Sequence, residues 1–238
     1  MSQEYIKQFD RLDYPFSSRD FDPEHWLVQP DSSVLCGGRG GSLKFILQQQ
    51  PMVLHRYLRG GMVARFLHDQ YLWLGKKHTR PCKEQQVVEH ARAMDLPVPR
   101  MLAYRIQQRG LFYRAASINQ FIENQGSLAD YIGQQPLHGD AWAQLGGLIK
   151  KMHQAGIYHA DLNANNILID HAMGLHLIDF DKARLNPAGT DWRQDNLQRL
   201  RRSLDKIARY RAEQARPFHF VEADWQALLG AYGVESGR

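Results

Sequence analysis

Apolar residues in the first half of the chain form short runs bounded by glycines and prolines, a pattern typical of strands. The strands expected from these runs are a hairpin over 34–48 and single strands over 52–57, 101–107 and 111–118. Val87, Val88 and Ala91 recur instead at helical spacing and predict a helix over 82–94.

Two other segments in this half have a weaker pattern. Mixed aromatic and basic residues over 62–80 indicate a further helix. Residues 1–33 are polar and aromatic, and Pro15, Pro23 and Pro30 interrupt them, so we expect an N-terminal extension with little regular structure.

The second half of the chain has helical periodicity. An amphipathic helix is expected over 141–154, a strongly basic one over 195–212 with leucines on one face, and a last one around Trp225. Strands followed by helices predict an α+β fold with two lobes. The sheet-rich lobe would span 34–122 and the helical lobe 123–238.

Composition and charge narrow the class of protein. The 238 residues are 43% hydrophobic and 23% charged, which excludes wholesale disorder. A net charge of +5 favours an anionic partner without choosing among nucleotide, phosphorylated substrate, membrane surface and nucleic acid. Two cysteines, Cys36 and Cys82, form neither a metal cluster nor a disulfide framework, which favours a reducing compartment.

No signal peptide and no long apolar run is visible in the sequence. We therefore expect a protein that is soluble or attached to a membrane surface.

One stretch carries the chemistry. His159, Asp161 and Asn166 fit the pattern H-x-D-x-x-x-x-N, and Asp179-Phe180 follows thirteen positions after Asn166. Phosphoryl transfer from ATP-Mg²⁺ needs a carboxylate at the attacking hydroxyl and oxygen ligands on the metal. Asp161 is the candidate catalytic base, Asn166 and Asp179 are the candidate metal ligands, and His159 is interpreted as a structural residue.

A nucleotide needs further contacts, and the N-terminal half offers candidates. Glycines between the hairpin strands would let backbone N–H groups approach phosphate, and the candidates are Gly38, Gly40 and Gly41. The next strand has no lysine, so His55, Arg56 or Lys44 must supply the phosphate-binding cation, with Glu84 as its carboxylate partner. Backbone groups of Gln120 and Ile122 are the candidates for contacting the adenine.

Several absences bear on the substrate. Ala160 and Asn163 replace the arginine and lysine of protein kinases, and no Ala-Pro-Glu segment follows Asp181. A small hydroxylated molecule or a glycolipid is therefore favoured over a protein substrate. The basic helix carries Arg199, Arg201, Arg202, Lys206, Arg209 and Arg211, which suit either a solvated face or anionic lipid head groups.

Taken together, several segments resemble the lipopolysaccharide core kinase family, in particular its members that act on 3-deoxy-D-manno-octulosonic acid (Kdo). The segments that carry the resemblance are 53–61, 69–73, 96–100, 110–115, 158–168 and 177–182. His55 stands where related core kinases have lysine, and Asp181 replaces the usual kinase glycine.

The resemblance implies a protein-kinase-like fold, with Asp161 as base and Asn166 and Asp179 as metal ligands. It also implies ATP and Mg²⁺ as cofactors and the 4-hydroxyl of Kdo on Kdo-lipid IV-A as acceptor. The expected location is peripheral, at the cytoplasmic face of the bacterial inner membrane. Neither nucleic acid nor an obligate protein partner is expected.

Two alternatives stay open. A kinase of a soluble, cationic small molecule would need acidic residues around its cleft, whereas this chain has basic ones there. A kinase-fold module that binds nucleotide without turnover would explain the missing strand lysine, although Asp161, Asn166 and Asp179 argue against it.

Overall fold

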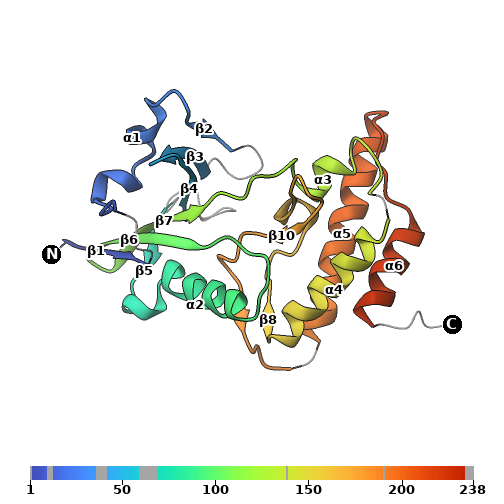
Figure 1. Cartoon of the computed structure of the whole chain (residues 1–238). Helices are drawn as coiled ribbons and strands as arrows, with labels where there is room; N and C mark the ends of the chain where they lie inside the picture. Colours follow the sequence, from blue (N-terminus) through green and yellow to red (C-terminus); the bar gives the residue numbers. More distant parts are fainter. Residues whose placement is uncertain are drawn as a thin grey trace. The chain divides into compact units, whose positions relative to one another are not determined.

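The computed structural model describes residues 2–9, 13–35, 42–58, 69–137, 139–189 and 191–233. The chain divides into two compact units (Figure 1). The first comprises Met1–Gln86 and Pro99–Phe121, and the second comprises Val87–Val98 and Ile122–Arg238. Helix α2 (Arg80–Ala93) contributes to both units, and it confirms the helix predicted over 82–94.

An antiparallel sheet forms the first unit (Figure 1), and its strand order is β1-β6-β7-β4-β3-β2, with β5 paired to β7. The strands are β1 (Ser2–Gln8), β2 (Ser33–Val34), β3 (Ser42–Leu47), β4 (Gln50–Arg56), β5 (Tyr71–Leu72), β6 (Met101–Arg109) and β7 (Phe112–Gln120). These include all the strands that the sequence predicted, and β2 and β3 are the two arms of the predicted hairpin.

Each face of this sheet has its own apolar core, because successive side chains of a strand point to opposite faces. On one face, Phe45, Met52 and Leu54 pack with residues of the N-terminal segment. On the other face, Tyr104 and Ile106 pack with residues of β1, β5 and α2.

The prediction of little regular structure over 1–33 is wrong. Strand β1 pairs with β6 from Ser2 to Gln8, and a 3-10 turn η1 (Ser18–Phe21) and helix α1 (Pro23–Leu27) follow it. Aromatic burial explains this order, because Trp26 is 1% exposed and stacks on Phe45 at 3.9 Å between ring centroids.

The helix predicted over 62–80 is also not found in its described part. That part contains strand β5 and a 3-10 turn η3 (Lys76–His78), and the rest of the segment lies outside the described residues. Tyr71 and Trp73 both pack against the sheet core, which is a period of two residues and not a helical one.

The second unit contains helices and short hairpins. The helices are α3 (Leu128–Tyr131), α4 (Ala141–Gln154), α5 (Trp192–Glu213) and α6 (Glu222–Tyr232). Strand β8 (Ile157–Tyr158) pairs with β11 (Arg184–Leu185), and β9 (Ile167–Ile169) pairs with β10 (Leu175–Leu177). The three helices predicted in this half are confirmed.

The core of this unit lies between α4, α5 and α6 and under the two hairpins (Figure 1). Leu145, Leu200 and Leu228, one from each long helix, are fully buried there. Gly146 permits the close approach of α4 to α6, because a Cβ at that position would lie 2.1 Å from the carbonyl oxygen of Leu228.

Candidate functional site

The loop that contains Asp161 connects β8 to β9 and is held by side-chain hydrogen bonds to its own backbone. Asn163 Nδ2 donates to the Asp161 carbonyl at 2.9 Å, and Asn163 Oδ1 accepts from the Asn165 N–H at 2.9 Å. The 3-10 turn η4 (Ala164–Asn166) begins there. This local bonding fixes the backbone on both sides of Asp161, whose side chain is exposed.

Asn166 links this loop to Asp179. Its Nδ2 donates to the Asp161 carbonyl at 2.9 Å, and its backbone carbonyl accepts from the Ile178 N–H at 3.0 Å. The pairing of Leu177 with Ile167 in the β9–β10 hairpin sets this register. These bonds tie the loop of Asp161 and Asn166 to Ile178, the residue before Asp179, within the second unit. We refer to Asp161, Asn166 and Asp179 as one cluster.

Two features of this cluster suit a cation. Because Asn166 Nδ2 is used on the Asp161 carbonyl, Oδ1 is the amide atom that remains to coordinate a metal. Asp179 has an exposed carboxylate and a left-handed backbone with φ of 64°, a conformation that costs free energy in a residue other than glycine. A carboxylate and an amide oxygen are the hard donors that Mg²⁺ prefers, so these residues fit the ion.

The structure contains no group of three or more His, Cys, Asp or Glu ligands among the described residues. A divalent ion at this cluster would therefore complete its coordination with nucleotide phosphates and water, which is how Mg²⁺ is usually held.

His159 lies next to this cluster and hydrogen-bonds to the backbone of the segments that carry the two aspartates. It is fully buried, its Nδ1 accepts from the Asp161 N–H at 3.3 Å, and its Nε2 therefore carries the proton donated to the Ile178 carbonyl at 2.9 Å. Burial lowers the pKa of His159, against the opposing effect of Asp179 and Asp161. The imidazole thus bridges the two segments that carry the aspartates, in agreement with the structural role expected for it.

Sequence reasoning missed Asn196 of α5, which is fully buried. Its Nδ2 donates to the His159 carbonyl at 2.9 Å, and its Oδ1 accepts from the His159 N–H at 3.1 Å. Its Oδ1 also lies 3.2 Å from Nε2 of His153, whose Nδ1 lies 2.8 Å from the Tyr232 hydroxyl. A polar residue on the apolar stripe of a helix is the sequence feature that could have identified it, because Asn196 lies one turn before Leu200.

In the first unit, His55 and Arg56 face opposite sides of the sheet because they are consecutive in β4. His55 Nδ1 lies 3.1 Å from Ser42 Oγ, and its ring contacts Tyr57 edge to face at 5.1 Å. The Tyr57 hydroxyl donates to the Glu84 carboxylate at 2.5 Å. Of the proposed cations on β4, only His55 therefore lies on the side of α2 and Glu84.

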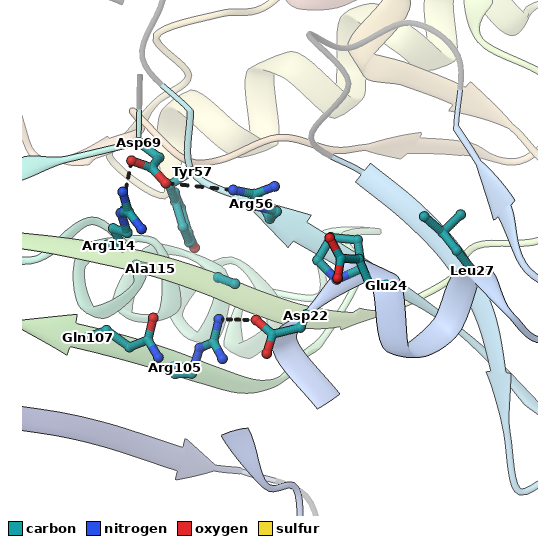
Figure 2. Close-up of a pocket in the computed structure, with 12 residues that line it drawn as sticks. Asp22, Glu24, Leu27, Arg56, Tyr57, Asp69, Arg105, Gln107, Arg114 and Ala115 are labelled. Atoms are coloured by element: carbon teal, nitrogen blue, oxygen red, sulfur yellow. Dashed lines mark hydrogen bonds and ion pairs between the residues drawn. The ribbon is translucent and has the colours of Figure 1, made fainter. Parts of the chain in front are cut away.

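Arg56 lies instead at a cavity of about 480 Å³ on the face that η1 and α1 cover. Figure 2 shows Arg56 and Arg114 on either side of Asp69, with nitrogen–oxygen distances of 3.7 and 3.0 Å. Arg105, in the same cavity, donates to Asp22 of the N-terminal segment at 2.8 Å. The structure thus places Arg56, one of the three proposed cations, on the opposite face of the sheet from His55.

The structure describes only some of the other residues proposed to bind nucleotide. Gly38, Gly40 and Gly41 lie outside the described residues. Lys44 lies over the Phe121 ring, with its Nζ 3.9 Å from the centroid. The Gln120 N–H donates to the Arg100 carbonyl at 2.8 Å, and the Ile122 carbonyl accepts from Asn124 at 2.6 Å.

The basic helix α5 uses part of its charge for folding. Arg201 binds Asp205 and Glu222, at 2.9 and 2.8 Å, and Arg211 donates to the Gly133 carbonyl at 3.0 Å. The cations that remain exposed on α5 are Arg202, Lys206 and Arg209. Among the described helices, none is long and apolar enough to cross a membrane.

Comparisons with known proteins agree with this chemistry. The family model described as lipopolysaccharide kinase (Kdo/WaaP) matches residues 24–232. A 3-deoxy-D-manno-octulosonic acid kinase of Xanthomonas campestris pv. campestris (strain B100) is 41% identical over 220 residues, which are 92% of this chain and 85% of that protein. A protein of the same name from Stenotrophomonas maltophilia (strain K279a) is 40% identical over 218 residues, with the same shares covered.

Proposed function

Because the chain belongs to the lipopolysaccharide kinase (Kdo/WaaP) family, we propose that it transfers the γ-phosphoryl group of ATP to a hydroxyl of Kdo in the inner core of lipopolysaccharide. The observation that carries this proposal is the cluster of Asp161, Asn166 and Asp179, joined through the Asp161 carbonyl and the Ile178 N–H. It supplies the three oxygen-bearing side chains that phosphoryl transfer to an alcohol requires.

In this mechanism, Asp161 orients the acceptor hydroxyl and accepts its proton as the new phosphorus–oxygen bond forms. The hydrogen bonds that Asn163 and Asn166 donate to the Asp161 carbonyl hold the backbone from which this carboxylate projects. Asn166 Oδ1 and the Asp179 carboxylate would hold Mg²⁺, which neutralises the charge that develops on the phosphate oxygens.

The nucleotide phosphates would be bound in part by the first unit. His55 is the cation candidate of β4 on the side of Glu84, and the Gly38–Gly41 segment directly precedes β3. Strand β4 has no lysine, and the Tyr57 hydroxyl donates to Glu84 on this side of the sheet. We propose that phosphate binding here relies on backbone N–H groups and on His55 more than on a lysine–glutamate pair.

The proposed acceptor is the 4-hydroxyl of Kdo on Kdo-lipid IV-A, encountered at the cytoplasmic face of the inner membrane. This glycolipid bears phosphates and a carboxylate, so a protein of net charge +5 with exposed cations on α5 is suited to approach it. Arg201 and Arg211 make hydrogen bonds within the fold. Arg202, Lys206 and Arg209 stay exposed on α5 and are available for this electrostatic attraction.

The test is a mass-spectrometric assay of the purified full chain with ATP-Mg²⁺ and Kdo-lipid IV-A, scored for one added phosphate. We expect product with the parent, and a loss of about a thousandfold or more with Asp161→Asn while ATP binding is retained. Asp195→Asn, an exposed carboxylate on α5, is the matched control. Product on soluble sugars or aminoglycosides alone would contradict the proposed acceptor.

A further inference from the structure

Three leucines at one end of the sheet in the first unit are turned to solvent. Leu72 is 52% exposed, Leu74 is 67% exposed and Leu111 is 72% exposed. They are neighbours, because Leu72 pairs with Phe112 in the β5–β7 ladder and the Trp73 N–H donates to the Leu111 carbonyl at 2.8 Å. We refer to these three residues as the leucine patch.

The residues between the leucines already supply the core. Trp73 stacks on Tyr5 with ring centroids 6.0 Å apart and meets Tyr113 edge to face at 6.1 Å. Tyr71 packs into the same cluster. Outward positions of a half-buried antiparallel strand are normally polar, yet here Leu72 and Leu74 occupy them. The leucine patch is therefore not required for packing within the unit.

The charge around the leucine patch is positive. Lys76, Lys77 and Arg109 are exposed beside it, and we call these residues the cationic rim. Residues 70–83 and 105–116, which contain both sets, include no Asp or Glu. On the neighbouring β1, Glu4 accepts hydrogen bonds from Ser18 and Gln107. Asp69, one residue outside these ranges, pairs with Arg114 at 3.0 Å, so both nearby carboxylates are engaged within the unit. An apolar surface bordered by exposed cations in this way is complementary to an anionic lipid surface.

We propose that the leucine patch and the cationic rim are the surface by which this protein docks on an anionic phospholipid bilayer. The leucines would enter the boundary between head groups and acyl chains, and the rim would contact lipid phosphates. The proposal extends the proposed function, in which the acceptor is a glycolipid presented by a membrane. It assigns the contact to the β5 and β6–β7 tips of the first unit, with the catalytic residues on the second.

The test is co-sedimentation of the full chain with vesicles of phosphatidylglycerol and phosphatidylethanolamine, without nucleotide or acceptor. Vesicles of phosphatidylcholine are the neutral comparison. One variant carries Leu72→Ser, Leu74→Ser and Leu111→Ser. A second carries Lys76→Gln, Lys77→Gln and Arg109→Gln. The control carries Val28→Ser and Val221→Ser, two apolar residues that are 82% and 61% exposed elsewhere on the chain.

We expect the parent to bind anionic vesicles and not neutral ones. The leucine variant should bind about a hundredfold more weakly at every salt concentration, because it loses apolar insertion. The lysine and arginine variant should bind about a hundredfold more weakly at low salt, with a difference that shrinks as salt is raised. The control should bind as the parent does, and all variants should keep the parent's melting temperature.

Three results would overturn the proposal: no binding of the parent to anionic vesicles, equal binding of the leucine variant and the parent, or a parent dimer that the leucine variant abolishes. Phosphorylation of a water-soluble Kdo glycoside, measured without lipid, separates this proposal from the enzymatic one. Vesicle binding without that activity would refute the proposed function alone. Activity without vesicle binding would refute the docking surface alone.

Discussion

Replacement of Asn196 by alanine tests whether α5 positions the catalytic loop. The side chain satisfies both backbone groups of His159, the N–H at 3.1 Å and the carbonyl at 2.9 Å, and also lies 3.2 Å from His153 Nε2. A buried polar group that loses its partner costs about 1–3 kcal/mol. With three groups affected and partial relief by water, we expect Asn196→Ala to lower the free energy of unfolding by about 3–5 kcal/mol.

The catalytic effect should be separable from the loss of stability. Because Asp161 lies two residues after His159, a shift of the loop would misplace the carboxylate and lower kcat about a hundredfold. ATP affinity should change little. Urea unfolding followed by tryptophan fluorescence gives the first quantity, and kcat measured at a temperature where the variant stays folded gives the second.

Gln194→Ala, an exposed amide on the same helix, is the matched control, and it should leave both quantities unchanged. Asn196→Asp keeps an acceptor for the His159 N–H but not the donor to its carbonyl, so it should fall between the parent and the alanine variant. A loss of stability below about 1 kcal/mol together with an unchanged kcat for Asn196→Ala would refute the positioning role.

Three further predictions concern other parts of the structure. Burial lowers the pKa of His153 from 6.5 to about 4 in the folded protein. As the pH falls, the unfolded chain therefore takes up a proton on His153 at a higher pH than the folded protein does. The free energy of unfolding should fall by about 3 kcal/mol as the pH drops from 6.5 to 4. Urea titrations of the parent and His153→Gln over this range measure it, and identical pH slopes would contradict it. Tyr57→Phe should lower the melting temperature more than Glu84→Gln does. The phenylalanine removes the hydroxyl that donates to the buried Glu84 carboxylate, whereas a glutamine at 84 keeps an oxygen that can accept from Tyr57. The reverse order in a thermal melt would argue against this. Asp179→Gly should raise the free energy of unfolding by about 1 kcal/mol by relieving the left-handed backbone while abolishing phosphoryl transfer. Asp179→Asn, which keeps the strain, should be the less stable of the two in urea.

The sequence predicted those elements in which local periodicity and tertiary packing agree. Helix α4 matches the predicted range of 141–154, because its apolar stripe faces the core along its whole length. The proposed catalytic residues could also be found from sequence, because the β9–β10 hairpin brings Asn166 and Ile178 together through short-range pairing. Whether Asp161, Asn166 and Asp179 act as assigned remains a prediction that the assay above tests.

The failures come from contacts between residues far apart in the chain. The N-terminal segment becomes ordered because β1 pairs with β6 about a hundred residues later, as in the pairing of Ser2 with Arg109, and because Trp26 stacks on Phe45. Similarly, Tyr57 and Glu84 are 27 residues apart, and no local pattern announces their hydrogen bond. In each case the partner residue is set by the tertiary fold, and local periodicity of the sequence carries no information about it.

The buried polar chain behind the proposed catalytic loop has one consistent direction. Asn196 Oδ1 can only accept, so His153 Nε2 carries the ring proton and donates to it at 3.2 Å. His153 Nδ1 then accepts from the Tyr232 hydroxyl at 2.8 Å. Asn196 Nδ2 then donates to the His159 carbonyl. Among uncharged side chains of this size, an amide alone offers a donor and an acceptor to the two backbone groups of a single residue.

A leucine at position 196 would leave both His159 groups buried without partners, and a carboxylate would need a proton to reproduce the donor. The same chain explains why His153 is neutral, because burial in a network that needs its Nδ1 as an acceptor disfavours the imidazolium. The position of the proposed catalytic loop thus depends on a neutral hydrogen-bonded chain between α6, α4 and α5. Acid that protonates His153 should therefore loosen the loop that carries Asp161.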